Sequence, residues 1–335
     1  MVLKTPLTRR SFTAGLGTLG AAGLTLGTPF IARAASKTTL KLGHLANEQD
    51  PWHKACLKFS EEVARLTNGE VDIKVFPNEQ LGKETDLIKG IQLGTVDFTI
   101  TGESLQNWAP SAALLAVPYA IRDLDHMSKV VNGPVGAKIA ANIEDKTQLR
   151  PLTYFPRGPR NLTSNRPIMT PDDLNGLKLR VPNVPLFVSF WQALGAKPTP
   201  MAFSEVFTSL QNGTIEAQEN PLALIKSASF YEVQKNVNLT EHVVSWIYLA
   251  GSAKKLDKMP KAHKDAIMAA AKTAGDYEHK LFAEDEKNLA AELKAKGMTF
   301  VKSDKAAFAK KGHDAVVAAL NPEVKPLFEQ MLAIS

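Results

Sequence analysis

Three side chains in one stretch of the chain could together hold a small anion. Arg180 lies in residues 177–181 (LKLRV), where apolar and basic residues alternate as in a strand with one buried face, so its side chain would point away from the core. Arg160 lies twenty positions earlier and Asn220 forty positions later. A guanidinium presents paired donors that match a carboxylate, and a second arginine with an amide donor would complete a clamp. These residues predict a carboxylate site, although a structural salt bridge at Arg180 fits the same pattern.

A long, ordered series of short segments surrounds these three residues. The segments are GPR at 158–160, TSNRPI at 163–168, DLNGLKLRVP at 173–182, GA at 195–196, PTPMAFSEV at 198–206, LQ at 210–211 and QENPL at 218–222. Through them the chain closely resembles the solute-binding proteins of tripartite ATP-independent periplasmic (TRAP) transporters, the DctP family. Weaker similarity covers residues 39–288. The sialic-acid-binding and sugar-acid-binding members look nearest, over residues 163–233.

The resemblance implies roles for individual side chains. Arg180 matches the arginine that forms the main salt bridge to the substrate carboxylate in that family. Arg160, Phe203 and Asn220 match further ligand contacts. The implied mechanism is hinge closure of two α/β lobes over a small carboxylate ligand, which then passes to one large and one small membrane subunit driven by an ion gradient. We expect no cofactor, no metal and no nucleic acid, and we expect a monomer that is not an enzyme.

Hydrophobic periodicity predicts the elements that must position these groups. Strands at 39–44, 71–76 and 96–101 alternate with helices at 51–67 and 84–93. That order predicts a mostly parallel sheet covered by helices, with ligands bound beyond the carboxyl ends of the strands. Further strands are expected at 149–155, 214–218, 236–239, 243–250 and 299–302, and further helices at 124–132, 135–144, 185–194, 203–210, 221–229, 306–320 and 323–334.

The predicted fold class is α/β, a two-lobed periplasmic-binding-protein-like fold. Residues 260–294 form a very long helical pattern, alanine-rich with interleaved charges, which we expect to span both lobes. We expect lobe I to comprise residues 35–157 with about 246–285. Lobe II is expected to comprise residues 158–245 with about 286–335.

The first 34 residues have the features of an export signal. A twin-arginine pattern, Thr8-Arg9-Arg10-Ser11-Phe12, precedes a weakly apolar run at 13–31, and Ala32-Arg33-Ala34 supplies a small-x-small cleavage signal. The weak hydrophobicity and Arg33 just before the cut favour twin-arginine export to the periplasm over the general secretion route. The many Gly and Thr residues and the cleavage signal argue against an uncleaved membrane anchor. This segment also supplies four of the six net positive charges, so the remaining +2 gives no case for a nucleic-acid partner.

Two acids are expected in the wall opposite the clamp. Glu103 follows the third strand, where it could accept hydrogen bonds from substrate hydroxyls or serve as an acid in the first turn of a helix. Glu84 follows the end of the second strand, in the same predicted wall. Polar residues at 47–49 extend that wall and favour a hydroxylated ligand.

A sugar acid, either a uronate or an aldonate, is therefore favoured over a C4-dicarboxylate. A dicarboxylate would need a second basic group in the opposite wall, and Lys83 and His44 are the nearby candidates. Both ligand classes remain open at this point.

Other chemistry finds little support in the sequence. The single cysteine, Cys56, permits no internal disulfide and falls on the apolar face of a predicted helix. No pair of histidines has the spacing of a zinc site, and no nucleophile elbow occurs. An exported enzyme acting on a small acid thus lacks a catalytic group. A periplasmic sensor that presents the ligand to a membrane kinase would use the same pocket and is not separated from transport by sequence.

Overall fold

The computed structural model describes residues 37–335, and the predicted export signal at 1–34 lies outside the described residues. A mixed nine-stranded sheet runs through this part of the chain, in the order β2-β1-β3-β8-β4-β7-β5-β6, with β9 paired to β8. The strands are β1 Thr38–Gly43, β2 Val71–Phe76, β3 Phe98–Thr101, β4 Leu149–Ser164, β5 Lys178–Val181, β6 Lys197–Pro200, β7 Ala217–Pro221, β8 Asn236–Ser252 and β9 Thr299–Val301.

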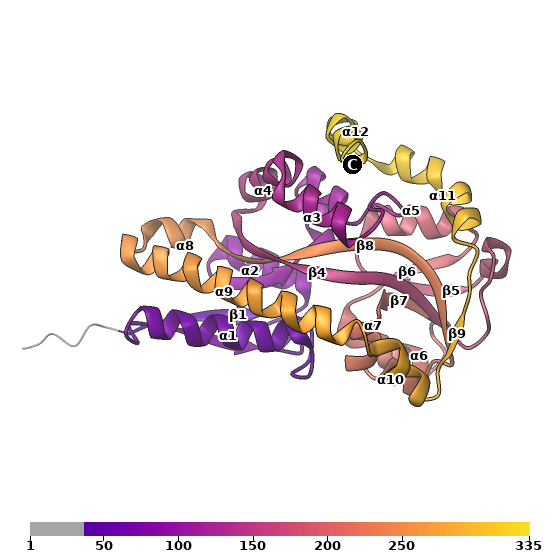
Figure 1. Ribbon diagram of the computed structural model, residues 1–335, viewed down its shortest axis with the longest axis horizontal. Coiled ribbons are helices and arrows are strands. Elements are labelled where there is room, and N and C mark those ends of the chain that lie inside the picture. The colour runs from indigo at the N-terminus through magenta and orange to yellow at the C-terminus, as the bar shows by residue number, and fades with distance from the viewer. Residues whose placement is uncertain (1–36) are drawn as a thin grey trace, which may run out of the picture. The chain divides into compact units, whose positions relative to one another are not determined.

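Two long antiparallel strands connect the two ends of the sheet (Figure 1). β4 and β8 pair from Leu149 opposite Ser252 to Ser164 opposite Asn236. The carboxyl end of β8 also pairs with β3, and the far end of β4 pairs with β7. The parallel set β2-β1-β3 therefore lies at one end and the set β7-β5-β6 at the other, and both depend on the same central pair.

The central pair corrects three strand predictions. The two strands expected at 236–239 and 243–250 are one strand, because the polar segment between them loops out of the pairing at a bulge, with Glu241 at a positive φ of 41°. The strand expected at 149–155 continues to Ser164 through further bulges. β7 spans Ala217–Pro221 and not residues 214–218, because its pairing with β4 runs from Ala217 opposite Ser164 to Pro221 opposite Arg160.

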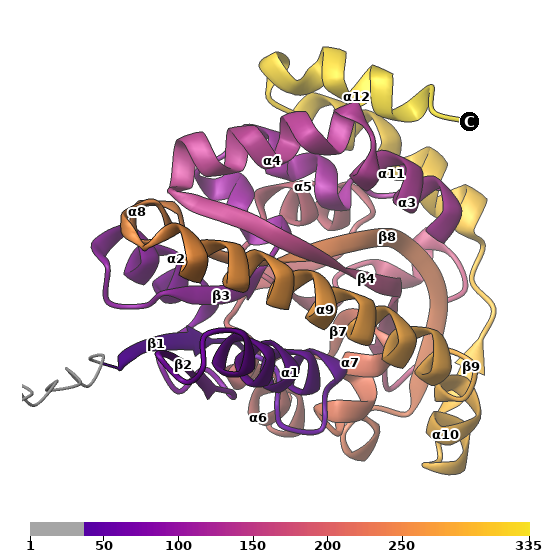
Figure 2. The ribbon, with the colours of Figure 1, turned by 60° about the vertical axis from the view of Figure 1, so that its left-hand side comes forward.

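Helices cover both faces of this sheet. They are α1 Pro51–Leu66, α2 Glu84–Leu93, α3 Leu124–Asn132, α4 Pro134–Thr147, α5 Pro185–Ala193, α6 Val206–Gln211, α7 Leu222–Ser227, α8 Ala253–Lys258, α9 Lys261–Asp285, α10 Leu289–Ala295, α11 Lys305–Ala319 and α12 Lys325–Leu332. In Figure 2, α9 lies along the crossing strands β4 and β8 with α1 beside it. The long helix is shorter than expected, since it ends at Asp285 and α10 follows as a separate helix.

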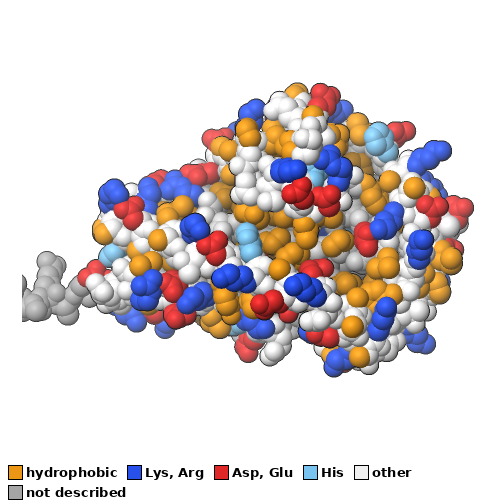
Figure 3. All heavy atoms as spheres, viewed as in Figure 1, with side chains coloured by type: hydrophobic (Ala, Val, Ile, Leu, Met, Phe, Trp, Pro, Cys, Tyr) orange, Lys and Arg blue, Asp and Glu red, His pale blue; other side chains and the backbone are white. Residues whose placement is uncertain are grey.

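The apolar core forms one cluster around α1, α9 and the first strands, a second around α2 to α5 and α11, and a third beneath α6, α7 and α10. Cys56 and Trp191 are fully buried in these clusters. On the face drawn in Figure 3, acidic and basic side chains are interspersed. Within residues 37–335 no helix combines the length and the apolar character needed to cross a membrane.

Candidate functional site

A cavity of about 330 Å³ lies at the carboxyl ends of strands from both halves of the sheet. That volume is within the usual range for a small-molecule pocket, about 300–1,000 Å³. The structure brings all six predicted site residues to its lining: Glu84, Glu103, Arg160, Arg180, Phe203 and Asn220. They come from α2, the segment after β3, the central strand β4, β5, the short turn after β6, and β7.

Arg180 is a buried cation whose charge is not neutralised by a carboxylate. Its side chain is 3% exposed, and its Nε and Nη2 donate to the Met201 carbonyl oxygen at 3.0 and 2.6 Å. Among residues 37–335 no carboxylate lies within 4.0 Å of its guanidinium. Burial, with the nearby Arg160, lowers the pKa of Arg180 to about 10, so it is still charged at neutral pH. The cavity thus presents a positive charge that the described residues leave without a counter-ion.

Arg160 has a different environment. Its guanidinium forms a forked pair with Glu219, with Nε–Oε2 at 2.5 Å and Nη2–Oε1 at 2.7 Å, and Nη1 reaches Glu103 at 3.2 Å. The ring of His242 lies 2.9 Å from the same Glu219 carboxylate. Against the cost of burial, Arg160 and His242 hold the pKa of Glu219 at about 2. Arg160 therefore already has buried partners, and its expected contact with a ligand carboxylate stays a prediction.

Asn220 and Phe203 line the cavity on the side of Arg180. Asn220 is buried, and its Nδ2 donates to Gln218 Oε1 at 2.7 Å, which leaves one N–H and the amide oxygen available. The Phe203 ring centroid lies 5.9 Å from the Arg180 guanidinium carbon. An aromatic face at that distance attracts the cation and supplies apolar area beside it.

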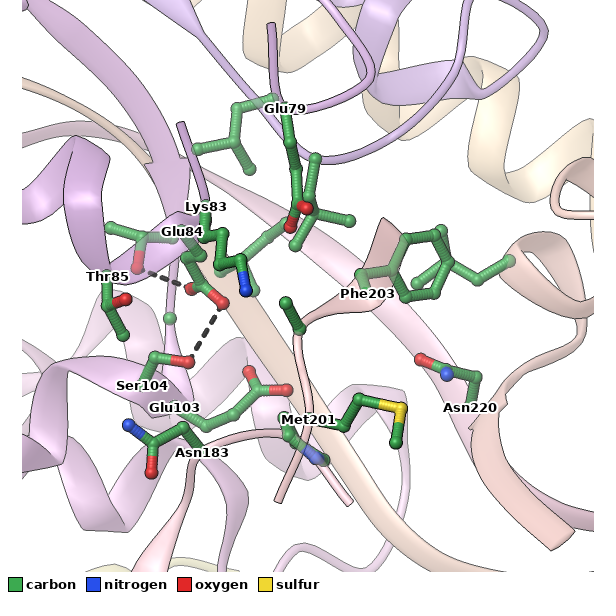
Figure 4. A pocket seen from close by; sticks show the side chains of 18 of the residues that line it. Glu79, Lys83, Glu84, Thr85, Glu103, Ser104, Asn183, Met201, Phe203 and Asn220 are labelled. Atoms are coloured by element: carbon green, nitrogen blue, oxygen red, sulfur yellow. Dashed lines mark hydrogen bonds between the residues drawn. The ribbon is translucent and has the colours of Figure 1, made fainter. Parts of the chain in front are cut away.

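The opposite side of the cavity carries acids, as Figure 4 shows for Glu84 and Glu103 facing Phe203 and Asn220. Glu84 accepts hydrogen bonds from Thr101 Oγ1 at 2.7 Å and Ser104 Oγ at 2.9 Å. Burial, together with the neighbouring Glu103, raises the pKa of Glu84.

Glu103 is paired with a cation that the sequence analysis missed. Arg157 Nη1 donates to Glu103 Oε1 at 2.6 Å, and the Arg157 guanidinium carbon lies 5.3 Å from the Trp52 ring centroid. Although burial opposes its ionisation, Glu103 has a lowered pKa because of Arg157 and Arg160. Arg157 and Arg160 are three residues apart, so a regular strand would place them on opposite faces. A bulge between them in β4 brings both to the cavity, and no sequence pattern announces that bulge.

Several candidates for the opposite wall are placed elsewhere. His44 is buried against His53, and burial followed by the charge of His53 lowers its pKa to about 3, so it is neutral and cannot be a second basic group. The polar segment at 47–49 does not line the cavity, and Asn47 instead donates to the Ser227 carbonyl oxygen at 2.5 Å. Lys83 does line the cavity, at its rim, where it pairs with Glu205.

The geometry of the cavity supports binding of a small ligand. Within the described chain, no group of three or more His, Cys, Asp or Glu residues could hold a metal ion. One wall supplies an unneutralised guanidinium with an amide and an aromatic ring, and the other supplies carboxylate acceptors. Such a cavity suits an anion that also carries hydrogen-bond donors.

Comparisons with known proteins agree with this chemistry. The profile of the DctP family, bacterial extracellular solute-binding protein family 7, matches residues 42–323. A TRAP periplasmic solute binding protein from Roseobacter denitrificans, crystallised with bound L-galactonate, has 58% sequence identity and a TM-score of 0.87. That match covers 90% of this chain and 100% of the other. It confirms the predicted two-lobed α/β fold.

Two further relatives show the range of ligands. The 2,3-diketo-L-gulonate-binding periplasmic protein of Escherichia coli is 35% identical over 274 residues, which are 81% of this chain and 83% of the relative. A TRAP periplasmic solute binding protein from Sulfurospirillum deleyianum, with bound succinate, has 29% identity and a TM-score of 0.83 over 90% of this chain and 100% of the other.

Proposed function

The chain belongs to the DctP family of solute-binding proteins, and from that premise we propose that it captures a hydroxylated organic acid through Arg180 for a TRAP transporter. The observation that carries the proposal is the buried guanidinium of Arg180, which faces the cavity without a carboxylate partner in residues 37–335. A ligand carboxylate would supply the missing charge in bidentate geometry. Asn220 donates an amide hydrogen bond to the ligand, and Phe203 covers its apolar side.

The ligand class follows from the two walls taken together. Arg180 binds the carboxylate, and Glu84 and Glu103 accept hydrogen bonds from hydroxyls at the other end. The Roseobacter relative with bound L-galactonate and the diketogulonate-binding relative of E. coli support a sugar acid, and an aldonate in particular. Arg160, which lines the cavity, orients Glu103 and Glu219 and contacts the ligand carboxylate.

Capture is completed by closure of the two lobes about β4 and β8. Lobe I comprises residues 35–157 with about 246–285, and lobe II comprises residues 158–245 with about 286–335. The cavity is lined from both groups, and closure would strip water from the ion pair at Arg180. The closed form delivers the ligand to the large and small TRAP membrane subunits. TRAP binding proteins are periplasmic, and residues 1–34 would direct export there by the twin-arginine route.

A ligand screen tests the proposal. We would purify the chain without residues 1–34 and record thermal melting with L-galactonate, D-galacturonate, sialic acid, succinate, 2-oxo acids and the uncharged galactitol and galactose. A ligand present at 100 times its dissociation constant adds about 2.7 kcal/mol of stability, which a raised melting temperature reveals. We expect shifts from sugar acids and none from galactitol or galactose. Equal shifts from uncharged sugars would overturn the role of Arg180.

A further inference from the structure

The charges around the cavity are mostly paired, with three exceptions. Arg157 pairs with Glu103 at 2.6 Å, and Lys83 pairs with Glu205 at the rim. Arg160 pairs with the buried Glu219 beside the cavity. Within residues 37–335, neither Arg180 nor Glu84 has an oppositely charged side chain within 4.0 Å. Glu79, which also lines the cavity, has no such partner either and accepts a hydrogen bond from the Ser204 hydroxyl. Arg180 is thus an unpaired cation, and Glu84 on the opposite wall is an unpaired anion.

Glu84 is held so that its remaining acceptor capacity faces the cavity. Its two carboxylate oxygens each accept one hydroxyl hydrogen bond, from Thr101 and Ser104, and each has a second lone pair left over. Figure 4 shows the carboxylate on the wall opposite Phe203 and Asn220. An ionised carboxylate can accept hydrogen bonds from ligand hydroxyls, but it cannot donate to a second carboxylate.

The neighbouring cations do not cancel this charge. The guanidinium of Arg157 offsets part of the charge of Glu84, but it already donates to Glu103 and lies over the Trp52 ring. Lys83 is half exposed and paired with Glu205, so water screens its field. A second ligand carboxylate at this wall would therefore meet Glu84 and Glu103 with no free cation beside them.

We propose that Glu84, supported by Glu103, restricts the cavity to acids with one carboxylate and a hydroxylated chain and excludes the corresponding diacids. This inference rests on the proposed function, because it takes the first carboxylate to be bound at Arg180. Like charges brought together across a recognition surface are a common means of rejecting wrong partners. The terminal CH2OH of an aldonate fits this wall, whereas the carboxylate of an aldarate does not.

The test compares acids that differ only at that terminus. Isothermal titration calorimetry at pH 7.5 would measure L-galactonate against galactarate, and D-erythronate against meso-tartrate. We expect each diacid to bind at least a hundredfold more weakly than its monoacid. Glu84→Gln removes the charge and keeps an acceptor oxygen. It should therefore lower the ratio of monoacid affinity to diacid affinity at least tenfold, chiefly because the diacid binds more tightly. Glu48→Gln, an exposed glutamate that does not line the cavity, removes the same charge and should leave the ratio unchanged.

Each outcome separates the two claims. Wild-type protein that binds the diacids within threefold of the monoacids would overturn the exclusion while leaving capture at Arg180 in place. An unchanged ratio in Glu84→Gln would remove Glu84 from the explanation. If no hydroxylated acid binds at all, the proposed function itself fails. The wild-type ratio decides the exclusion even if the variant were too unstable to purify.

Discussion

Arg180 is buried and its charge is not neutralised. Substitution can therefore distinguish a role in ligand binding from a role in stabilising the fold. Methionine has a similar length and no charge, so Arg180→Met removes the unpaired cation without leaving a buried anion behind. A buried charge without a partner destabilises the folded state. We expect the unliganded variant to be as stable as the wild type or more stable, by urea denaturation. We expect its affinity for the best sugar acid to fall at least a hundredfold, by calorimetry.

Arg160→Met is the matched comparison for this prediction. It leaves Glu219 buried without its forked partner, and loss of one member of a buried pair typically costs about 3–5 kcal/mol. We therefore expect a large loss of stability in Arg160→Met and no loss in Arg180→Met. Equal losses in the two variants would mean that Arg180 is also structural, contrary to the assignment.

Asp50 should make the stability of the folded protein depend on pH. It is buried at the N-terminus of α1, where Oδ1 accepts from the Trp52 backbone N–H at 3.0 Å and Oδ2 accepts from Ser227 Oγ at 3.0 Å. Burial raises its pKa from 3.8 to about 6. Between these values the folded state retains a proton that the unfolded chain releases. The resulting stabilisation is therefore present below about pH 4 and is lost as the pH rises through 6.

Asp50→Asn keeps the cap and removes the titration. We expect the stability of wild type relative to this variant to fall by on the order of 3 kcal/mol between pH 4 and pH 7, since one pKa unit corresponds to about 1.4 kcal/mol. Urea denaturation at four pH values in that interval measures the difference. Parallel curves for the two proteins would show that Asp50 does not titrate there.

Sequence predicted those parts of the candidate site that depend on residue type and motif, and it missed those that depend on the fold. Arg180 and Asn220 line the cavity, and they were predicted as ligand contacts from their chemistry and from the family resemblance. Arg157 was missed because its access to the cavity depends on a bulge, which arises from pairing with β8 and not from local preference. His44 was misjudged because its low pKa comes from burial and then from the nearby His53, and both arise from the fold.

At the scale of elements, α9 lies very close to the central strand β4. A Cβ built on Gly275 of α9 would overlap Oγ1 of Thr153. In an ordinary helix, Gly→Ala stabilises by about 1 kcal/mol. We expect Gly275→Ala to destabilise the protein instead, by about 1–3 kcal/mol, because a packed contact must open. Urea denaturation measures the change.

Thr153→Ala provides the partner for a double-mutant cycle. It removes the hydroxyl that the new methyl group would meet, so the double variant should recover part of the lost stability. We expect a favourable coupling of at least 0.5 kcal/mol, about the threshold for residues in contact. Additive effects would show that the close approach of α9 to β4 does not limit the packing.

The elements that sequence placed wrongly share a cause. After Pro260 the helical pattern runs to residue 294 without a further proline, yet α9 ends at Asp285 and α10 begins at Leu289. α10 instead packs beneath α7, where Lys226 pairs with Glu292. Residues 286–288 are compatible with a helix, so only tertiary packing decides the break. Long, strongly periodic elements such as α1 and β2 were placed to within a residue because packing and local pattern agree there.

In the described part of the chain, side-chain contacts join the two sides of the cavity mouth. Lys83 pairs with Glu205, and Glu79 accepts from the Ser204 hydroxyl, so the segment before α2 meets the segment before α6. Asn107 Nδ2 donates to the Asn183 carbonyl oxygen at 2.8 Å on another side. In the proposed lobe division all three join lobe I to lobe II. These contacts would form on closure and would contribute to affinity without touching the ligand's carboxylate.

A charge exchange at the rim tests this coupling. Lys83 and Glu205 side chains are 52% and 46% exposed, and exposed pairs of this kind contribute about 0.2–1 kcal/mol. Lys83→Glu alone replaces an attraction with a repulsion, so affinity for the best sugar acid should fall about three- to tenfold at low salt. Glu205→Lys places two like charges together in the same way, but it adds a cation near an anionic ligand, so its loss should be smaller.

The double exchange restores both the pair and the net charge of the rim. We expect it to recover affinity to within about twofold of wild type, measured by calorimetry at 20 mM salt. At 0.5 M salt the Debye length falls to a few ångströms, so the affinities of the three variants should become similar. A double variant as weak as Lys83→Glu, with no dependence on salt, would show that the pair does not assist closure. In that case the lower affinities of the variants would come from direct effects of the changed charges on the bound ligand.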